Sequence, residues 1–490
     1  MAGIEAWGVY IPLYRLSRKE IAQAWGVPAM AGERSVANAD EDSLTMAVEA
    51  GRECLLDVEP DEVDALFFAS ATAPYIEHQC AATIAAALDL RREIYTADFG
   101  DSLRAATAAL RAAADAVSSG SARKALVVAA DRRPGEPGSN WEQMLGDGAA
   151  AVLLSAEGPI QIKALHSITS DIVGPWRRTE DRFVQSFDAK LETDYGYVQS
   201  VAQAAGAVLK KAGLEPKEIA KAAFYAPDPR AYTAAARKLG LEQAQLQDSL
   251  FNSVGNAGTP LALIMLAGAL EEARPGDRLL LASYGNGSDA FLLEVATEPR
   301  RPAGHRSLAA YLASKRFIPT YTIYASQRGM VEREAPPPPQ GSAAIYWRDT
   351  AFELRFHGAR CKGCGLVHYP IPRVCDQCGT RDTLEEVKLP RRGTVFTFTL
   401  DHLLRGEYLN TPIPRVVIEI EGGGRAFLEM TDTDPSEVKI GMPVELTFRC
   451  LHEAAGFHNY YWKCRPVRAR EPVPDGPAYS PSRPASGESR

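Results

Sequence analysis

The chain has 490 residues, which at ~150 residues per domain suggests about three domain-sized units. It contains 54 Lys and Arg against 62 Asp and Glu, a net charge of −8, with 46% hydrophobic and 24% charged residues. This composition is ordinary for a globular protein and excludes a disordered or collagen-like chain. A mildly acidic chain without basic runs is also a poor binder of nucleic acid or of anionic membranes.

The ends and the cysteine count indicate the compartment. The opening MAGIEAWGVYIP has no basic region followed by an apolar core, so no signal peptide is predicted. The longest nearly apolar run, residues 257–270, is too short for a membrane span and contains Gly and Pro. We therefore expect a cytoplasmic protein. Eight cysteines in this length do not form a disulfide framework, and a cluster of four in a reducing compartment is typical of metal binding.

Residues 1–300 alternate strand-like and helix-like segments and look duplicated. Long Ala-rich helices are expected at about 102–118 and 257–273, each before two strand-like runs, and the Gly-x-Gly turns at 146–148 and 285–287 match in position. This repeat predicts an α/β sandwich of two similar halves, about 1–156 and 157–300. Strands are expected at 3–11, 63–70, 93–99, 123–131, 146–155, 159–168, 221–226, 248–251, 278–285 and 285–295.

A further helix is expected at 37–55. Asp40, Glu41 and Asp42 lie at its start, where carboxylates interact favourably with the helix dipole. We favour that structural role for the three residues over a role in catalysis.

The remaining residues divide by composition. Residues 301–344 form a connector that ends in the proline-rich segment 334–342, a stiff linker. Residues 345–390 contain the clustered cysteines, and 391–468 contain alternating runs at 393–403, 414–431 and 442–451 that are typical of a small β-barrel. Cys450 and Cys464 lie in such runs and are expected as core thiols. Residues 469–490, rich in Pro, Ser and Arg, are predicted to be disordered.

The cysteine cluster is the most specific motif. Cys361, Cys364, Cys375 and Cys378 form two C-x2-C pairs separated by ten residues, and Gly365 and Gly379 follow the pairs. Four thiolates with this spacing can surround one tetrahedral ion with no open position, which predicts a structural zinc, with iron as the minor alternative.

This cysteine pattern, followed by strands, resembles the acyl-CoA-associated zinc-ribbon and OB-fold family that accompanies thiolase-like enzymes. The resemblance covers residues 345–468 and implies a rubredoxin-like zinc ribbon followed by an OB-type barrel. An OB barrel alone also suggests single-stranded nucleic acid, but the acidic chain and its companion domain argue against such a partner.

Six segments of residues 1–300 carry a second resemblance. They are similar to the thiolase superfamily, and most closely to 3-hydroxy-3-methylglutaryl-CoA synthase and the ketoacyl synthases. The likeness implies a five-layered sandwich, a coenzyme A thioester as substrate and a two-fold homodimer. It also implies that the C-terminal domain lies beside the mouth of the tunnel that binds the acyl group. The segments are GVYIPLYRLSRKEIAQAWG (8–26), GERSVANADEDSLTMAVEA (32–50), TAPY (72–75), RAATAAL (104–110), NSVGNAGTP (252–260) and YGNGSDAF (284–291).

The chemistry of that family needs a cysteine nucleophile at a helix N-terminus, where the helix dipole favours the thiolate. Matching RAATAAL to the family pattern puts Leu103 at the cysteine position, and residues 93–110 contain no cysteine. The family histidine falls in FYAP, where Tyr225 takes its place, whereas the family asparagine is present as Asn256. The resemblance therefore implies that the residues that position the substrate are present, whereas the cysteine and histidine that transfer the acyl group are not.

Other residues are candidates for the missing roles. Ser102 is a candidate nucleophile but also suits, with Asp101, the cap of the following helix. Glu77, just after TAPY, is a candidate acidic base by the resemblance, or a surface-loop residue. Tyr225 can donate to an oxyanion, act as acid or base if its pKa is lowered, or only fill the space of the histidine.

Leu103, Asn286 and Gly287 are the candidate substrate-binding residues. Backbone N–H groups near Ser102 or at the Gly287 turn are expected to stabilise enolate charge.

Three functions are compatible with this pattern. The favoured one is an enzyme that forms or cleaves a carbon–carbon bond by aldol or retro-aldol chemistry on a β-hydroxyacyl-CoA, without a cysteine acyl-enzyme. The second is an acyltransferase of the hydroxymethylglutaryl-CoA synthase or ketoacyl synthase kind that uses Ser102. The third is a non-catalytic acyl-CoA-binding subunit that supports a partner protein.

Overall fold

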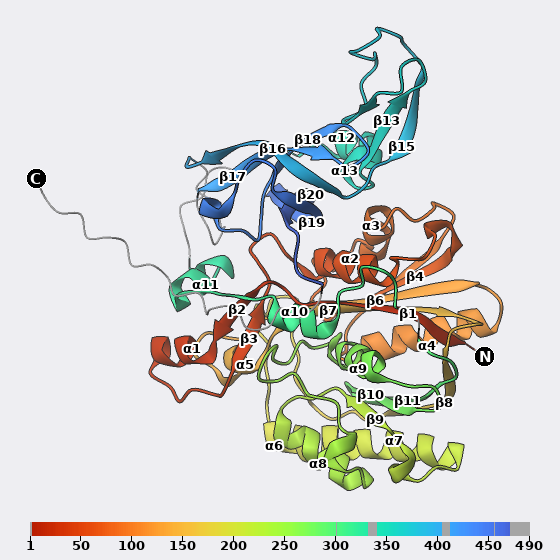
Figure 1. The fold of residues 1–490 in the computed structure, drawn as a ribbon. Helices are drawn as coiled ribbons and strands as arrows, with labels where there is room; N and C mark the ends of the chain where they lie inside the picture. Colours follow the sequence, from red (N-terminus) through yellow and green to blue (C-terminus); the bar gives the residue numbers. More distant parts are fainter. Residues whose placement is uncertain (1, 300, 332–340, 404–411, 455, 471–490) are drawn as a thin grey trace, which may run out of the picture.

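The protein is described here by a computed structural model that covers residues 2–299, 301–331, 341–403, 412–454 and 456–470 (Figure 1). Its largest element is a nine-stranded sheet in the order β5-β4-β6-β7-β1-β8-β11-β10-β9. The first half supplies β1 (Gly3–Tyr10), β4 (Val63–Ala69), β5 (Tyr95–Phe99), β6 (Lys124–Arg132) and β7 (Asp147–Ser155). The second half supplies β8 (Ile160–Thr169), β9 (Lys221–Phe224), β10 (Arg278–Tyr284) and β11 (Gly287–Val295).

The strand order repeats between the halves. The first half reads β4-β6-β7-β1 and the second, in reverse, β9-β10-β11-β8, with β5 as an added edge strand in the first half. In each half a parallel pair, β4–β6 or β9–β10, is followed by an antiparallel pair, β6–β7 or β10–β11. The halves join where Gly3 and Ile4 of β1 pair with Gln161 and Ile160 of β8. The duplication predicted from the sequence is confirmed.

The predicted strand at 248–251 is wrong, and local hydrogen bonds explain why. Asp248 Oδ1 accepts from the Leu250 N–H at 2.9 Å, and Leu250 has φ of 58°. The Leu250 carbonyl then accepts from the N–H groups of residues 253, 254 and 255. An Asx turn followed by a left-handed residue turns the chain back on itself and ends any extended run.

Helices make the other layers of the sandwich. α2 (Ser43–Cys54) packs on β1, β6 and β7, while α7 (Gln199–Ala212) packs on β8, β10 and β11. α4 (Ala105–Ser118) and α9 (Leu261–Glu272) lie between the half-sheets, α3 (Cys80–Ala87) lies beside α2, and α8 (Pro229–Leu239) beside α7 (Figure 1). The result is five layers, helix–sheet–helix–sheet–helix.

The middle helix α9 illustrates why the sequence folds this way. Residues 261–270, LALIMLAGAL, are apolar on all faces and all buried, as a helix between two sheets requires. Both Ala-rich helices begin three or four residues later than predicted, at Ala105 and Leu261, and α2 begins at Ser43 rather than at 37.

Smaller elements connect these layers. They are β2 (Tyr14–Ser17), β3 (Glu33–Val36) and β12 (Arg316–Phe317), which form one sheet, with helices α1 (Arg18–Trp25), α5 (Asn140–Met144), α6 (Ala189–Leu191), α10 (Leu308–Ala313) and α11 (Tyr321–Gln327), and a π-helical segment Glu192–Val198.

The C-terminal part has two sheets. A three-stranded sheet, β14-β13-β15, carries the cysteines, and a five-stranded sheet, β18-β17-β16-β19-β20, forms the OB-type barrel. The predicted proline linker lies outside the described residues except for 341–342, as does the predicted tail after residue 470. The elements are α12 (Ala343–Arg348), α13 (Thr350–Glu353), β13 (His357–Cys361), β14 (Val367–His368), β15 (Leu384–Lys388), β16 (Arg392–Asp401), β17 (Ile413–Ile420), β18 (Arg425–Glu429), β19 (Pro443–Ala454) and β20 (Phe457–Pro466).

The acidic residues before α2 have roles that the helix dipole does not describe. Asp42 does cap α2, since its Oδ1 accepts from the Thr45 N–H at 2.8 Å. Glu41, however, pairs with Arg449 of the barrel, and Asp40 Oδ2 lies 3.1 Å from the Lys463 Nζ. The dipole interpretation is therefore wrong for Asp40 and Glu41, which bind the barrel to the sandwich.

The same interface continues along α2. Arg465 of β20 reaches Glu49 of α2 at 2.8 Å and Glu445 of β19 at 2.9 Å. Arg306 pairs with Glu53 at 3.1 Å and with Glu445 at 3.2 Å. Because buried charges are tolerated only when paired, separating the barrel from α2 would be costly. Figure 1 shows β19 and β20 of the barrel beside α2.

Candidate active site and cysteine cluster

The two residues at the family histidine and asparagine positions meet inside the sandwich. Tyr225 directly follows β9, and its backbone N–H donates to the Ala282 carbonyl of β10 at 2.9 Å. Asn256 lies in the loop before α9 and is fully buried, with its Oδ1 accepting from the Gly258 N–H at 2.9 Å. Its Nδ2 donates to the Tyr225 hydroxyl at 2.8 Å. The amide thus fixes the position of the phenol oxygen.

The Tyr225 hydroxyl is a donor rather than a base. Burial raises the pKa of Tyr225 to about 12, against the charge of Arg133 and the hydrogen bond from Asn256, so the phenol stays protonated at neutral pH. Among the described residues none accepts its hydrogen. The condition of a lowered pKa is not met, and the hydroxyl instead offers one free O–H to a ligand oxygen.

The position of the family nucleophile holds no reactive group. Leu103 is buried one residue before the N-cap of α4, Arg104. The Ser102 hydroxyl donates to the Gly285 carbonyl at 3.1 Å, with no base among the described residues bonded to it. Nor does Ser102 cap α4, which has no side-chain cap and begins at Ala105.

The glycine turn at 285–287 packs tightly on this position. A Cβ on Gly285 would collide with the Ser102 Oγ and lie 3.0 Å from the Leu103 nitrogen. No acceptor for the Leu103 N–H is found among the described residues. Gly287, at φ of 110°, begins β11 and is buried, whereas Asn286 is exposed at the tip of the turn. Of the three candidate binding residues, Leu103 and Gly287 face the interior.

Two charged residues near Tyr225 were missed from the sequence. Glu192, at the start of the π-helical segment, is half-buried, and desolvation raises its pKa to about 7 against the opposing charge of Arg133. Arg133 directly follows β6 and is 3% exposed. The end of a predicted strand could have pointed to Arg133, because ligands bind at strand ends in such sheets, but Glu192 lies in a stretch without any pattern.

Glu77 lies elsewhere. It is exposed in the loop before α3, and its neighbour Tyr75 accepts from the His458 N–H of the barrel at 2.8 Å. The TAPY segment is thus a contact of the barrel, and no described contact joins Glu77 to Tyr225 or Asn256.

The cysteines outside the cluster are structural. Cys54 and Cys80 are buried in helices, and burial raises the pKa of the Cys80 thiol to about 12. Cys450 and Cys464 are free thiols on β19 and β20. None of the four carries the features of a nucleophile.

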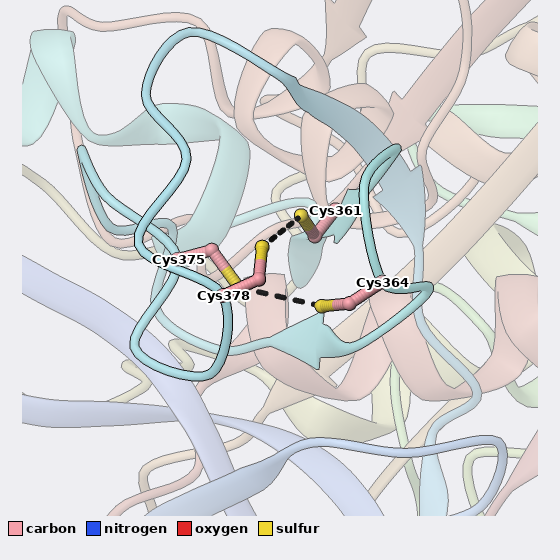
Figure 2. A group of neighbouring side chains, drawn as sticks. All are labelled: Cys361, Cys364, Cys375 and Cys378. Carbon is pink, nitrogen blue, oxygen red and sulfur yellow. Dashed lines mark hydrogen bonds between the residues drawn. The ribbon is translucent and has the colours of Figure 1, made fainter.

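The four clustered cysteines converge as their spacing predicts. Figure 2 shows the sulfurs pointing toward one another, with 3.6 Å between Cys361 and Cys378 and 3.5 Å between Cys364 and Cys375. All four ligand atoms lie within 4.8 Å of one another. Sulfurs 2.3 Å from a tetrahedral ion are separated by ~3.8 Å, so the donor set is compatible with zinc.

Backbone turns and one hydroxyl support this arrangement. The N–H groups of Gly365 and Gly379, at φ of 78° and 70°, donate to the carbonyls of Cys361 and Cys375 at 2.8 Å, which gives two equivalent turns. Hydrogen bonds, first of all from the Thr380 hydroxyl, lower the pKa of the Cys361 thiol to about 5.

The two histidines near the cluster have other partners. His368 Nδ1 lies 2.8 Å from Asp376 Oδ1, and His357 pairs with Asp89 and Glu386. These contacts are typical of packing or surface residues, although His368 also lies near Cys375.

Comparison with known proteins agrees with both parts of the fold. The model of 3-oxoacyl-[acyl-carrier-protein] synthase III matches residues 97–171, and its C-terminal model matches 209–293. The ChsH2 C-terminal OB-fold domain matches residues 386–449. Together they define a thiolase-like sandwich joined to an OB-fold domain.

Similarity to whole proteins is more specific. The chain is 35% identical over 344 residues to hydroxymethylglutaryl-CoA synthase of Methanothermobacter thermautotrophicus, covering 67% of this chain and 99% of that protein. The corresponding enzyme of Pyrococcus horikoshii is 31% identical, covering 66% of this chain and 95% of that protein. The chain therefore belongs to the hydroxymethylglutaryl-CoA synthase family.

Solved structures share the fold at lower identity. An HMG-CoA synthase complexed with CoA has a TM-score of 0.61 at 20% identity, covering 69% of this chain and 92% of that chain. MvaS in complex with 3-hydroxy-3-methylglutaryl coenzyme A has a TM-score of 0.58 at 22% identity, covering 69% of this chain and 94% of that chain.

Within the described residues, every helix is too short or too polar to cross a membrane.

Proposed function

We propose that the protein is an acyl-CoA-dependent enzyme that forms or cleaves a carbon–carbon bond, by aldol or retro-aldol chemistry on a β-hydroxyacyl-CoA and without an acyl-enzyme. The coenzyme A thioester follows from its relatives, which are named for CoA substrates or bound to them. The single observation that carries the reaction type is the Tyr225 hydroxyl, held by Asn256 with its own hydrogen free.

In the retro-aldol direction, the proposed reaction begins at the β-hydroxyl of the substrate. The β-hydroxyl gives its proton to Glu192, with the Tyr225 hydroxyl hydrogen-bonded to the reacting oxygen. The Cα–Cβ bond breaks, the β-carbon becomes a carbonyl, and the electron pair passes to the thioester as an enolate. The Glu192 carboxyl then returns this proton to the enolate at Cα, which restores the starting charge of the site. Aldol addition is the reverse.

Each residue has a role that its environment supports. Glu192, with a pKa raised to about 7 by burial, is a proton acceptor matched to neutral pH. Tyr225 remains protonated and acts as a hydrogen-bond donor. The N–H of Leu103 lies where backbone donors of this fold type can stabilise an enolate oxygen. Leucine at this position offers no thiol for a thioester between substrate and protein.

The two alternative functions, an acyltransferase and a non-catalytic subunit, predict different outcomes when the protein meets an acyl-CoA. A Ser102 acyltransferase would form an ester on the protein, but the Ser102 hydroxyl donates to the Gly285 carbonyl instead of to a base. A non-catalytic acyl-CoA-binding subunit would bind the thioester and release nothing. Glu192 near Tyr225 favours a catalyst over a scaffold, because carboxyl groups with pKa values raised by desolvation are typical of catalytic sites.

The purified chain, incubated alone with a panel of β-hydroxyacyl-CoAs, tests the proposal. We expect free aldehyde or ketone and a shortened acyl-CoA, with no increase in the mass of the intact protein. An ester adduct on Ser102 supports the synthase alternative. Binding of acyl-CoA without turnover supports the scaffold.

The proposal includes a bound metal ion and an oligomeric state. Cys361, Cys364, Cys375 and Cys378 hold one structural zinc per chain, remote from bond chemistry. The sandwich forms a cytoplasmic homodimer, and a further protein subunit remains compatible with the barrel.

A further inference from the structure

The barrel contacts the sandwich at two points through residues of β20. The Tyr460 hydroxyl donates to Asp42 Oδ2 at 2.6 Å, and His458 Nδ1 lies 3.3 Å from the same oxygen. The backbone N–H of His458 donates to the Tyr75 hydroxyl at 2.8 Å. Asp42 is the N-cap of α2, so β20 binds both the start of this helix and the loop that follows β4.

Thr72 joins these two contact points inside the sandwich. It lies three residues before Tyr75, and its hydroxyl is 2.8 Å from the hydroxyl of Ser43, the buried first residue of α2. The Thr72 hydroxyl donates to Asp131 Oδ1 at 3.0 Å. Because a hydroxyl has one hydrogen to give, Ser43 is the donor between the two hydroxyls. A directed chain of hydrogen bonds therefore runs from the start of α2 to Asp131.

Asp131, near the end of β6, bridges two loops with its two carboxylate oxygens. It is fully buried, and Oδ1 accepts three hydrogen bonds from residues 70–72. Oδ2 accepts from the Thr259 N–H at 2.8 Å, and a Cβ on Gly258 would collide with this oxygen. The carboxylate thus ties the loop after β4 to the loop before α9.

The turn that Asp131 holds is the one that positions Tyr225. The N–H of Gly258 donates to Asn256 Oδ1 at 2.9 Å, and Asn256 Nδ2 donates to the Tyr225 hydroxyl at 2.8 Å. Asn256 and Thr259 are both fully buried, so water does not readily replace a lost bond. Contiguous hydrogen bonds of this kind can carry energetic coupling between distant parts of a protein.

We infer that the docked barrel regulates the geometry of the reacting pair, with Thr72 as the positioning residue between β20 and the Asn256 turn. While β20 holds Asp42 and Tyr75, the turn keeps Asn256 against the phenol. Loss of these contacts lets the turn open more often. This inference rests on the proposed function only in taking Tyr225 and Asn256 as the reacting pair.

Amide hydrogen exchange of the full chain, read by mass spectrometry without substrate, tests the inference apart from catalysis. The readout is the peptide that contains residues 256–259. Tyr460→Phe should speed its exchange roughly 3–10-fold, the effect of one lost hydrogen bond on local opening. Tyr461→Phe is the matched control and should leave the peptide unchanged, because this neighbour on β20 pairs with the Tyr369 hydroxyl at 2.7 Å.

Variants of Thr72 locate the link. Thr72→Val should speed exchange of the same peptide at least as much as Tyr460→Phe, and Thr72→Ser, which keeps the hydroxyl, should restore slow exchange. The double variant of Thr72→Val with Tyr460→Phe should exchange no faster than Thr72→Val alone, because both changes interrupt one chain. Thr233→Val removes an exposed hydroxyl that donates to the Pro229 carbonyl of α8 and should have no effect.

Unchanged exchange of residues 256–259 in Tyr460→Phe would overturn the inference. An equal rise in Tyr461→Phe would do the same, because the barrel would then act only through general stability. Additive rises in the double variant would show that Thr72 and Tyr460 act independently. The comparison of Tyr460→Phe with Tyr461→Phe decides the matter even if no Thr72→Val chain folds.

Turnover separates the coupling from the proposed reaction. Thr72→Val should lower kcat for a cleaved β-hydroxyacyl-CoA roughly 3–10-fold and leave KM unchanged, because Thr72 acts on the reacting pair and not on substrate binding. If exchange responds as expected and no β-hydroxyacyl-CoA is cleaved, the proposed reaction fails while the coupling stands. If cleavage occurs and exchange does not respond, the reverse holds.

Discussion

The Asn256 amide donates to the Tyr225 hydroxyl at 2.8 Å, so the phenol oxygen is fixed while its hydrogen stays free. Because burial raises the pKa of Tyr225 to about 12, the group that Asn256 positions is a neutral phenol. Tyr225 and Leu103 take the two positions at which the family resemblance implies histidine and cysteine, while the asparagine is retained as Asn256.

Removing the hydroxyl of Tyr225 tests its role most directly. Tyr225→Phe keeps the ring that packs 6.2 Å from Tyr197, and we expect a roughly 10²–10³-fold lower rate of cleavage with an unchanged melting temperature. Tyr232→Phe is the control, since that buried hydroxyl donates to the carbonyls of Ala222 and Gln247. It should lower stability and leave the rate alone. Full activity in Tyr225→Phe would remove the basis of the proposed reaction.

The cysteine cluster should determine the metal content. Elemental analysis of freshly purified protein is expected to give one zinc per chain, and Cys361→Ser should lose the metal and the stability of the C-terminal sheets, because structural zinc contributes directly to folding. Cys450→Ser, a free thiol outside the cluster, should retain both. Well under one zinc in the unaltered protein would contradict the assignment.

Arg449 should be the residue most important for attaching the barrel. It is fully buried between Glu41 and Asp432, and Arg449→Met removes the ion-pair partner of Glu41 and one of the two partners of Asp432, a loss of about 3–5 kcal/mol. Arg425→Met removes an exposed arginine beside Phe396 and should cost little. Thermal unfolding of the two variants compares them, and similar melting temperatures would show that the network does not hold the interface.

The edge strand β5 is the expected site of dimerisation. Among the described strands it pairs only with β4, and Tyr95 on it is 66% exposed, which leaves its outer edge free to pair with a second copy. Light scattering should give twice the chain mass at micromolar concentration, and Tyr95→Lys should give a monomer. Trp347→Lys, at an 80% exposed aromatic residue on α12, should remain dimeric. A monomer before any substitution would exclude the dimer.

Local patterns and motifs predicted much of this molecule. The strands follow from apolar runs, and the cluster follows from two C-x2-C pairs, because each depends on residues near one another in the sequence. The interface could not be predicted, because Asp40 and Lys463 are more than 400 positions apart and each alone looks like an ordinary surface charge. Glu192 was missed for the same reason, since only the fold buries it beside Arg133.

The pH dependence of the reaction should report Glu192. Burial raises its pKa from 4.5 to about 7, and the carboxylate is the form that accepts the proton. In the cleavage direction kcat/KM should therefore fall about tenfold per pH unit below 7 and be level above it.

The folding stability that Glu192 contributes changes with pH in the opposite direction to the rate. The folded state favours the protonated carboxyl, so the stability it contributes is full below pH 4.5 and is lost as the pH rises through about 7. Glu192→Gln, which is neutral at every pH, should thus fold at least as stably at pH 8 while losing roughly 10²–10⁴-fold in rate and the acidic limb of the profile. Asp194→Asn, at an exposed carboxylate of the same π-helical segment, should change neither. An acidic limb that persists in Glu192→Gln would assign the proton to another group.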